Sequence, residues 1–213
     1  MDGAEQARAY AEADFSASNR LFVDLFGALH PSGFAGRAVD LGCGPGDIPL
    51  RFLRRYPNAS VDGVDGAQPM LDLARQLAGA IPDLAQRLRW VLDVLPSTRL
   101  EAGGYDAVLS NSLLHHLADP QDLWRAVRHC GRAGAAVLVM DLARPDDEGG
   151  VEHVLAQHAV GAAPALLEDF RNSLHAAYTL DEVRAQLAAA GLDHLAVAMV
   201  SDRHLAVSGF LAA

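Results

Sequence analysis

Residues 38–50, which read AVDLGCGPGDIPL, constrain the fold of this chain more than any other segment. A short apolar run ends in Asp40, and three glycines then occupy alternate positions: Gly42, Gly44 and Gly46. Because glycine has no Cβ, a turn built from it lets the backbone approach a bound ligand closely, and the helix that follows presents free N–H groups. The segment predicts a strand, a tight turn and a helix over residues 47–56, with Asp47 as its N-terminal cap.

A second acidic residue lies where the next predicted strand ends. Residues 61–65 read VDGVD, and Asp65 closes that run. An acidic side chain at the end of the second strand of such a unit accepts hydrogen bonds from ribose hydroxyls. The glycine turn and Asp65 together predict a site for a cofactor that carries a nucleoside.

Strand and helix patterns alternate along most of the chain. Apolar residues at helical spacing predict one or two helices within residues 4–30. The predicted strands beyond them cover residues 37–41, 59–64, 88–92, 105–110 and 135–141. Further helices are predicted over residues 68–78 and 120–129. This alternation is typical of an α/β fold with a mainly parallel sheet and helices on both faces.

The pattern changes after Arg144. A polar loop leads into a predicted helical region over residues 151–175, and another helix follows over residues 179–190. We expect Thr179 to cap that helix and Gly191 to end it. The last two predicted strands, residues 195–200 and 204–211, are so close in sequence that they predict an antiparallel hairpin.

Composition excludes several kinds of chemistry. The chain has 213 residues and a formal net charge of −10, and its basic residues are all arginine. No Schiff-base lysine or P-loop is therefore available, and the acidic balance argues against nucleic acid as a partner. The apolar runs are too short for a membrane span. With two cysteines and no secretory signal, we expect a cytoplasmic protein.

Five motifs in order resemble those of the class I S-adenosylmethionine-dependent methyltransferases: VDLGCGPG, VDGVDGAQPML, WVLDVLP, YDAVLSNSLLHHL and VLVMDLARP. The resemblance covers residues 35–145, and the fourth motif is similar to that of the small-molecule ubiquinone and menaquinone biosynthesis group. It implies one domain with a Rossmann-like, seven-stranded, mostly parallel sheet and an antiparallel C-terminal hairpin. The expected parts are cover helices (1–30), a cofactor-binding core (35–145), a helical substrate lid (145–178), and a C-terminal helix and hairpin (179–213).

The resemblance implies S-adenosylmethionine as the cofactor and S-adenosylhomocysteine as its product. It places Asp40 near the cofactor's ammonium group and Asp65 on the ribose. Met70 would cover the adenine, and Asp93 would reach the adenine amino group. The expected cofactor-binding residues are Asp40, Gly42, Cys43, Gly44, Gly46, Asp65, Gly66, Met70, Asp93, Val94 and Asn111.

Two other functions remain open at this point. A nicotinamide-dependent oxidoreductase has a G-x-G-x-x-G turn, whereas the glycines here are spaced G-x-G-x-G. Pro45 also removes one N–H group, and Asp47 places a negative charge where a diphosphate would lie. The other alternative is a non-catalytic S-adenosylmethionine-binding partner subunit, against which the intact Asp40, Asp65 and Asn111 argue.

Three residues are candidates for the chemistry. Methyl transfer depends on aligning the acceptor with the methyl group, and an alcohol or phenol acceptor also benefits from a base. We expect a small-molecule acceptor, with oxygen ahead of nitrogen and carbon as the acceptor atom. His115 and His116 follow the fourth strand and point about 100° apart if helical, so at most one faces the cleft directly; we favour His116. Asp141, at the end of the fifth strand, is the third candidate. The histidine spacing matches no metal-site pattern such as H-E-x-x-H.

The region of residues 145–178 mixes polar and aromatic side chains and is typical of a cover over a small acceptor. From this region we expect Arg171, His175 and Tyr178 to bind substrate. Arg171 is suited to an acceptor with a carboxylate or phosphate, because its planar guanidinium binds such groups through two hydrogen bonds. Tyr10, near the N-terminus, is the fourth substrate-binding candidate. Monomer and homodimer both remain open.

Overall fold

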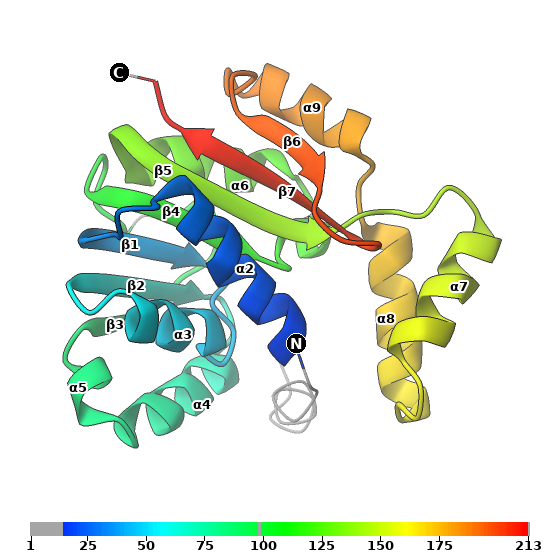
Figure 1. The fold of residues 1–213 in the computed structure, drawn as a ribbon, viewed down its shortest axis with the longest axis horizontal. Coiled ribbons are helices and arrows are strands. Elements are labelled where there is room, and N and C mark those ends of the chain that lie inside the picture. The colour runs from blue at the N-terminus through cyan, green and yellow to red at the C-terminus, as the bar shows by residue number, and fades with distance from the viewer. Residues whose placement is uncertain (1–14, 98, 213) are drawn as a thin grey trace.

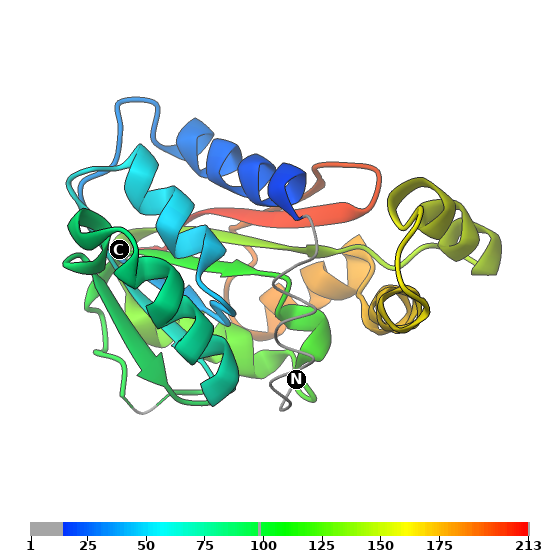
Figure 2. The ribbon, with the colours of Figure 1, turned by 90° about the horizontal axis from the view of Figure 1, so that it is seen from below.

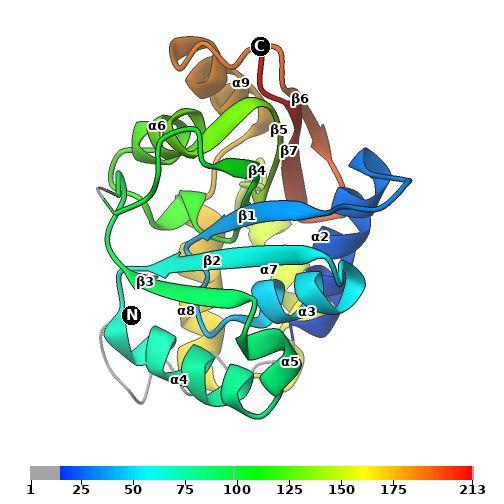
Figure 3. The same ribbon diagram turned by 90° about the vertical axis from the view of Figure 1, so that its left-hand side faces the viewer.

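A computed structural model describes residues 15–97 and 99–212. Its seven strands are β1 (Gly36–Leu41), β2 (Ala59–Asp65), β3 (Leu88–Leu92), β4 (Tyr105–Asn111), β5 (Gly131–Leu142), β6 (Ala196–Met199) and β7 (His204–Phe210). They form one sheet in the order β3-β2-β1-β4-β5-β7-β6 (Figures 1 and 3). β1 to β5 pair in parallel, and β7 runs antiparallel between β5 and β6. The predicted Rossmann-like sheet with an antiparallel C-terminal pair is confirmed.

Helices cover both faces of the sheet (Figure 2). On one face, α2 (Ser16–Leu29) and α3 (Asp47–Arg55) bury Phe22, Phe26 and Phe52 completely. On the other face lie α6 (Gln121–Cys130) and α9 (Leu180–Ala189). The remaining helices are α4 (Gln68–Gly79), α5 (Pro82–Ala85), the short 3₁₀ helix η1 (Leu114–His116), α7 (Glu148–His158) and α8 (Pro164–Ala176).

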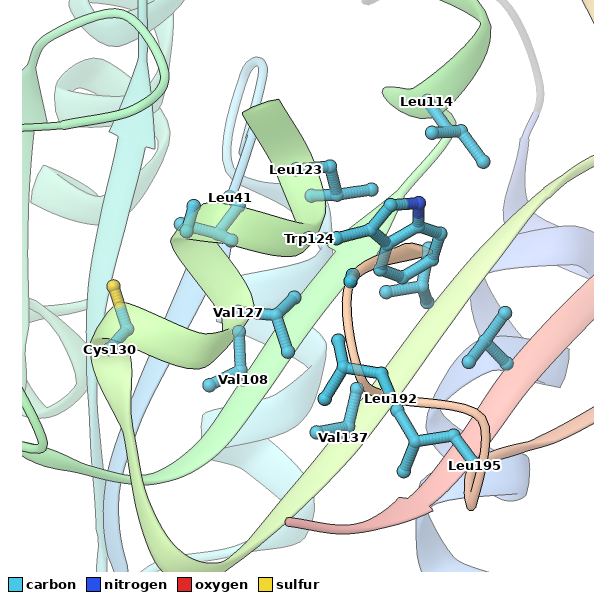
Figure 4. Packing of buried hydrophobic residues seen from close by; sticks show 14 of the residues in the cluster. Leu41, Val108, Leu114, Leu123, Trp124, Val127, Cys130, Val137, Leu192 and Leu195 are labelled. Carbon is cyan, nitrogen blue, oxygen red and sulfur yellow. The ribbon is translucent and has the colours of Figure 1, made fainter. Parts of the chain in front are cut away.

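Trp124 of α6 is the largest fully buried side chain and anchors its layer to the sheet (Figure 4). It lies in one apolar cluster with Val108 of β4, Val137 of β5 and Leu192, which follows α9. The indole N–H donates to Oε1 of Gln186 at 3.0 Å. The ring is therefore buried without leaving its polar group unpaired.

One local prediction is confirmed in more detail, and another is wrong. The helical region predicted over residues 151–175 is two helices, because Gly161 has a left-handed φ of +76° and Pro164 begins the second helix. Asp47 does not cap α3: it is the first residue of that helix, and the capping position belongs to Gly46, with φ at 86°. By contrast, Thr179 does cap α9, in a capping box with Glu182.

α7 and α8 extend beyond the edge of the sheet (Figures 1 and 2). They pack against each other through an apolar cluster separate from the two layers around the sheet. Its buried members are Leu142, Val151, Val154, Leu155, Leu174 and Ala177. α8 also contacts η1, the turn that carries His115 and His116. Within the described residues, no helix is both long enough and apolar enough to cross a membrane.

Candidate active site

A cavity of about 620 Å³ opens at the carboxyl ends of the central strands. Asp40 of β1, Asp65 of β2 and Asn111 of β4 reach it from three neighbouring strands. Phe15, Ser16 and Asn19 border it from the start of α2. The cavity therefore lies at the edge of the sheet where ligands bind in open α/β folds.

The glycine turn contributes Gly42, Cys43, Gly44 and Pro45 to the lining of this cavity, whereas Gly46 is not among the described lining residues. Gly42, Gly44 and Gly46 all have left-handed φ angles, of +75°, +52° and +86°. A Cβ on Gly42 would lie 2.7 Å from Cδ1 of Leu113, so a side chain there would also displace the neighbouring segment. The backbone N–H groups of Gly42 and Cys43 donate to the carbonyl of Val64, at 2.8 and 2.9 Å, which joins the turn to β2.

Asp65 holds the turn from the opposite side. One carboxylate oxygen accepts from the N–H of Gly44 and the other from the N–H of Ala67, both at 2.8 Å. Burial raises the pKa of Asp65, while these two hydrogen bonds act in the opposite direction. Each oxygen keeps a second lone pair, which is available to hydroxyl donors in the cavity.

Asp40 is the most unusual polar group of the site. It is only 1% exposed, and neither of its carboxylate oxygens has a hydrogen-bond partner among the described residues. Burial, and then the nearby charge of Asp65, raise the pKa of Asp40 well above its ordinary value. An unpaired buried carboxylate is unfavourable, so this end of the cavity is suited to a cationic ligand group.

The expected adenine-binding residues are only partly brought together. Gly66, Met70 and Val94 line the cavity. The carboxylate of Asp93 accepts from its neighbour's N–H, on Val94, at 3.0 Å and from the hydroxyl of Ser97 at 2.7 Å. Asp93 is not among the described residues that line the cavity, so its expected contact with adenine stays a prediction.

The two histidines have different surroundings. His115 is buried, and its Nδ1 lies 2.5 Å from Oδ1 of Asp141. His116 lines the cavity, and its ring centroid lies 4.0 Å from that of His115. His116 is an exposed residue, yet the protein packed around its ring and the neighbouring His115 lower its pKa to about 4. The imidazole facing the cavity is therefore neutral at physiological pH.

Asp141 is not among the described residues that line the cavity, so its expected catalytic role stays a prediction. It is 1% exposed, and its oxygens accept from His115 and from the N–H groups of Leu114 and Leu142, both at 2.7 Å. Through these hydrogen bonds, the carboxylate of Asp141 holds η1 against the end of β5. Ser112, with a left-handed φ of 56°, turns the chain from β4 into η1. Asp141 thus holds His115, and the ring of His115 packs against the ring of His116.

Three of the four predicted substrate-binding residues, Arg171, His175 and Tyr178, pair with other parts of the described structure. Arg171 of α8 pairs with Glu148 at 3.0 Å and with Glu152, both on α7. His175 lies 3.5 Å from Glu148, and the backbone carbonyl of Tyr178 accepts from Arg144. None of these three is among the described residues that line the cavity. Tyr10 lies outside the described residues.

Asn19 and Arg51 are among the cavity residues that the sequence did not predict. Asn19 lies on the apolar side of α2 near Phe22 and Val23, and a polar residue at such a position was a usable indication. Arg51 follows Asp47 at the i+4 spacing of a helical ion pair, and the two side chains are 2.6 Å apart. The spacing alone did not show that the pair borders the ligand cavity.

Comparisons with known proteins agree with the fold. Residues 39–137 match the family model described as a methyltransferase domain. An uncharacterised methyltransferase of Mycobacterium tuberculosis is 26% identical over 155 residues, covering 71% of this chain and 75% of that protein. The malonyl-[acyl-carrier protein] O-methyltransferase of Geobacter sulfurreducens is 32% identical over 192 residues, covering 89% and 66%. A crystal structure of an S-adenosylmethionine-dependent methyltransferase from Aquifex aeolicus superposes with a TM-score of 0.70 at 14% identity, covering 99% and 100%.

The fold and the cavity are thus those of a Rossmann-like methyl-transferring enzyme. The chain belongs to the class I S-adenosylmethionine-dependent methyltransferases. Its cofactor is S-adenosylmethionine, and the unpaired Asp40 and the Asp65-bound glycine turn fit that cofactor. This assignment replaces both alternatives that the sequence left open, the nicotinamide-dependent oxidoreductase and the non-catalytic subunit.

Proposed function

We propose that this enzyme methylates an oxygen atom of a small-molecule acceptor and that His116 removes the acceptor's proton. The observation that carries the proposal is the position of the His116 imidazole in the wall of the cavity, where it can reach an acceptor. A base must be unprotonated to accept a proton, and the lowered pKa of His116 keeps it so over the whole physiological range. His115 and Asp141 act as positioning residues, because they hold η1 and the ring against which His116 lies.

The cofactor supplies a methyl group bound to a positively charged sulfur, which makes the methyl carbon electrophilic. We assign Asp40 to its ammonium group, Asp65 to the ribose hydroxyls, and Met70 with Val94 to the adenine. The glycine turn brings backbone close to the amino-acid portion, since it presents no Cβ atoms there. These residues bind and orient, and orientation is the main contribution an enzyme makes to a displacement of this kind.

One comparison supports an oxygen acceptor, and one contact supports a lid beside His116. The relative from Geobacter sulfurreducens is named as a malonyl-[acyl-carrier protein] O-methyltransferase. In this chain, α8 contacts η1, and the charge of Asp169 on α8 acts on His116. We therefore assign residues 145–178 as a substrate lid beside His116, within one domain that spans residues 1–213. The net charge of −10 supports an acceptor other than nucleic acid.

The test measures transfer of radiolabelled methyl groups from S-adenosylmethionine to a panel of carboxylic acids, phenols, alcohols, amines and carbon acids. We expect product only with oxygen acceptors. With the best phenol or alcohol, His116→Gln should lower turnover about 100-fold and leave cofactor affinity unchanged. His153→Gln is the matched control, because His153 is exposed on α7. Methylation confined to amines or carbon acids would reject the oxygen assignment, and full activity in His116→Gln would reject the base.

A further inference from the structure

A chain of hydrogen bonds crosses the cavity from α3 through α2 to β4. The Nε of Arg51 donates to Oδ2 of Asp47 at 2.6 Å, and the side-chain amide of Asn19 donates to the same oxygen at 2.5 Å. The amide of Asn111 then donates to Oδ1 of Asn19 at 3.2 Å. All four side chains line the cavity. They are therefore placed to contact a ligand as well as one another.

This series of hydrogen bonds fixes the orientation of the side-chain amide of Asn111. Its N–H₂ group is used by Asn19, so its oxygen remains free, buried and without a partner among the described residues. Asp40 and Asn111 lie at the carboxyl ends of the paired strands β1 and β4. Three unpaired acceptor oxygens thus lie near one end of the cavity, and an ammonium group carries three N–H donors to match them.

Arg51 supplies hydrogen-bond donors to the cavity, where Asp40 and Asn111 supply acceptors. It is the sole arginine among the described residues that line the cavity, and its side chain is 29% exposed. A guanidinium has five N–H donors in a planar fork, and the bond to Asp47 uses the Nε donor. The remaining donors are suited to a carboxylate, which a guanidinium binds through two parallel hydrogen bonds.

We propose that Arg51 binds the α-carboxylate of the cofactor, and that Asn19 positions the oxygen of Asn111 for the α-ammonium group. This inference rests on the cofactor site described under the proposed function and assigns two further residues to it. It also gives α2 a specific role. Asn19 belongs to α2, whereas Asn111 and Arg51 belong to β4 and α3, so the bound amino-acid end joins the covering helix to the sheet.

The assignment is tested by calorimetric titration with three ligands that differ only in or near the amino-acid end. S-adenosylmethionine has both charged groups, decarboxylated S-adenosylmethionine keeps only the ammonium, and 5′-methylthioadenosine has neither. Arg51→Gln should weaken binding of the first ligand about tenfold or more and change binding of the other two less than twofold. Asn19→Ala should weaken the first two ligands alike and spare the third.

Matched controls are available on the same helices. Arg54→Gln on α3 and Arg20→Ala on α2 remove exposed charges, and neither should alter the affinity for any of the three ligands. Arg51→Lys should restore part of the lost affinity for S-adenosylmethionine, because it restores the positive charge. An equal loss for all three ligands in Arg51→Gln, or no loss at all, would overturn the assignment.

The wild-type protein gives a second measurement that does not depend on a variant folding. It should bind S-adenosylmethionine at least about tenfold more tightly than the decarboxylated ligand. Equal affinity would reject a carboxylate contact by Arg51 while leaving the proposed function intact. Failure of the wild-type protein to bind S-adenosylmethionine at all would instead reject the proposed function.

Discussion

Replacing Asp40 by asparagine should weaken cofactor binding and at the same time alter the pH dependence of stability. Asp40 is buried with both oxygens unpaired, and burial, followed by the charge of Asp65, raises its pKa well above the ordinary value of 3.8. At pH values between these two pKa values, the folded protein holds a proton on Asp40 that the unfolded chain has lost. The unfolded chain therefore binds fewer protons than the folded protein in this window.

The magnitude follows from the linkage between proton binding and stability. Up to one extra proton is bound by the folded state, so the free energy of unfolding of the wild-type protein falls as the pH rises through the window. The slope contributed by Asp40 is at most about 1.4 kcal/mol per pH unit. Asp40→Asn lacks this contribution and gains stability relative to wild type toward neutral pH. The same variant loses a charged acceptor for the ammonium group and should bind S-adenosylmethionine about 10- to 100-fold more weakly.

The assay is urea unfolding without cofactor, followed by tryptophan fluorescence in half-unit steps from pH 4.5 to 7.5, together with calorimetric titration of the cofactor. Asp62→Asn is the contrasting variant. Burial alone would raise the pKa of Asp62, but hydrogen bonds from Arg89, Tyr105 and Arg37 outweigh it and lower the pKa. Its stabilisation is fully present above the unfolded pKa of 3.8 and is lost only as the pH falls below that value, so the difference between wild type and Asp62→Asn should stay nearly flat from pH 4.5 to 7.5. Parallel profiles for wild type and Asp40→Asn, with unchanged cofactor affinity, would refute the reasoning.

Three further outcomes are expected. The pH–rate profile with an oxygen acceptor should lose activity on the acid side well below pH 6.5, near pH 4, because His116 must be neutral to act as a base; an acid limb at pH 6.5 would contradict this. Asp65→Ala should weaken cofactor binding by about 1–3 kcal/mol, measured by calorimetry, and unchanged affinity in a folded variant would move the ribose site elsewhere. Thr179→Ala removes the capping box of α9 and should lower the free energy of unfolding by about 0.5–2 kcal/mol without changing cofactor affinity, as urea unfolding and titration can show.

The parts of the structure that depend on local patterns were predictable. The glycine turn, the alternating elements and the cap at Thr179 each depend on a few neighbouring residues, and the structure has all of them. The split of the predicted helix at 151–175 was visible in Gly161 and Pro164, but the apolar spacing on either side obscured it.

The parts that depend on long-range contacts were not predictable. Arg171 has the chemistry of an anion receptor, yet Glu148 and Glu152 on another helix already pair with it. Asp141 ends a strand at the correct edge, but it is used by His115 and by backbone N–H groups beside it. A residue type indicates what a side chain can bind. Which partner it binds depends on packing between segments that are distant in the sequence.

The separate apolar cluster between α7 and α8 has an evolutionary consequence. Its side chains pack mainly on one another, and Leu142 at the end of β5 joins them to the sheet. Substitutions on the outward and η1-facing sides of this pair of helices therefore need no compensating change in the two layers around the sheet. On the lid role that we propose for this segment, acceptor preference can diverge between related enzymes by exchange of the segment, while the residues assigned to the cofactor stay under their own selection.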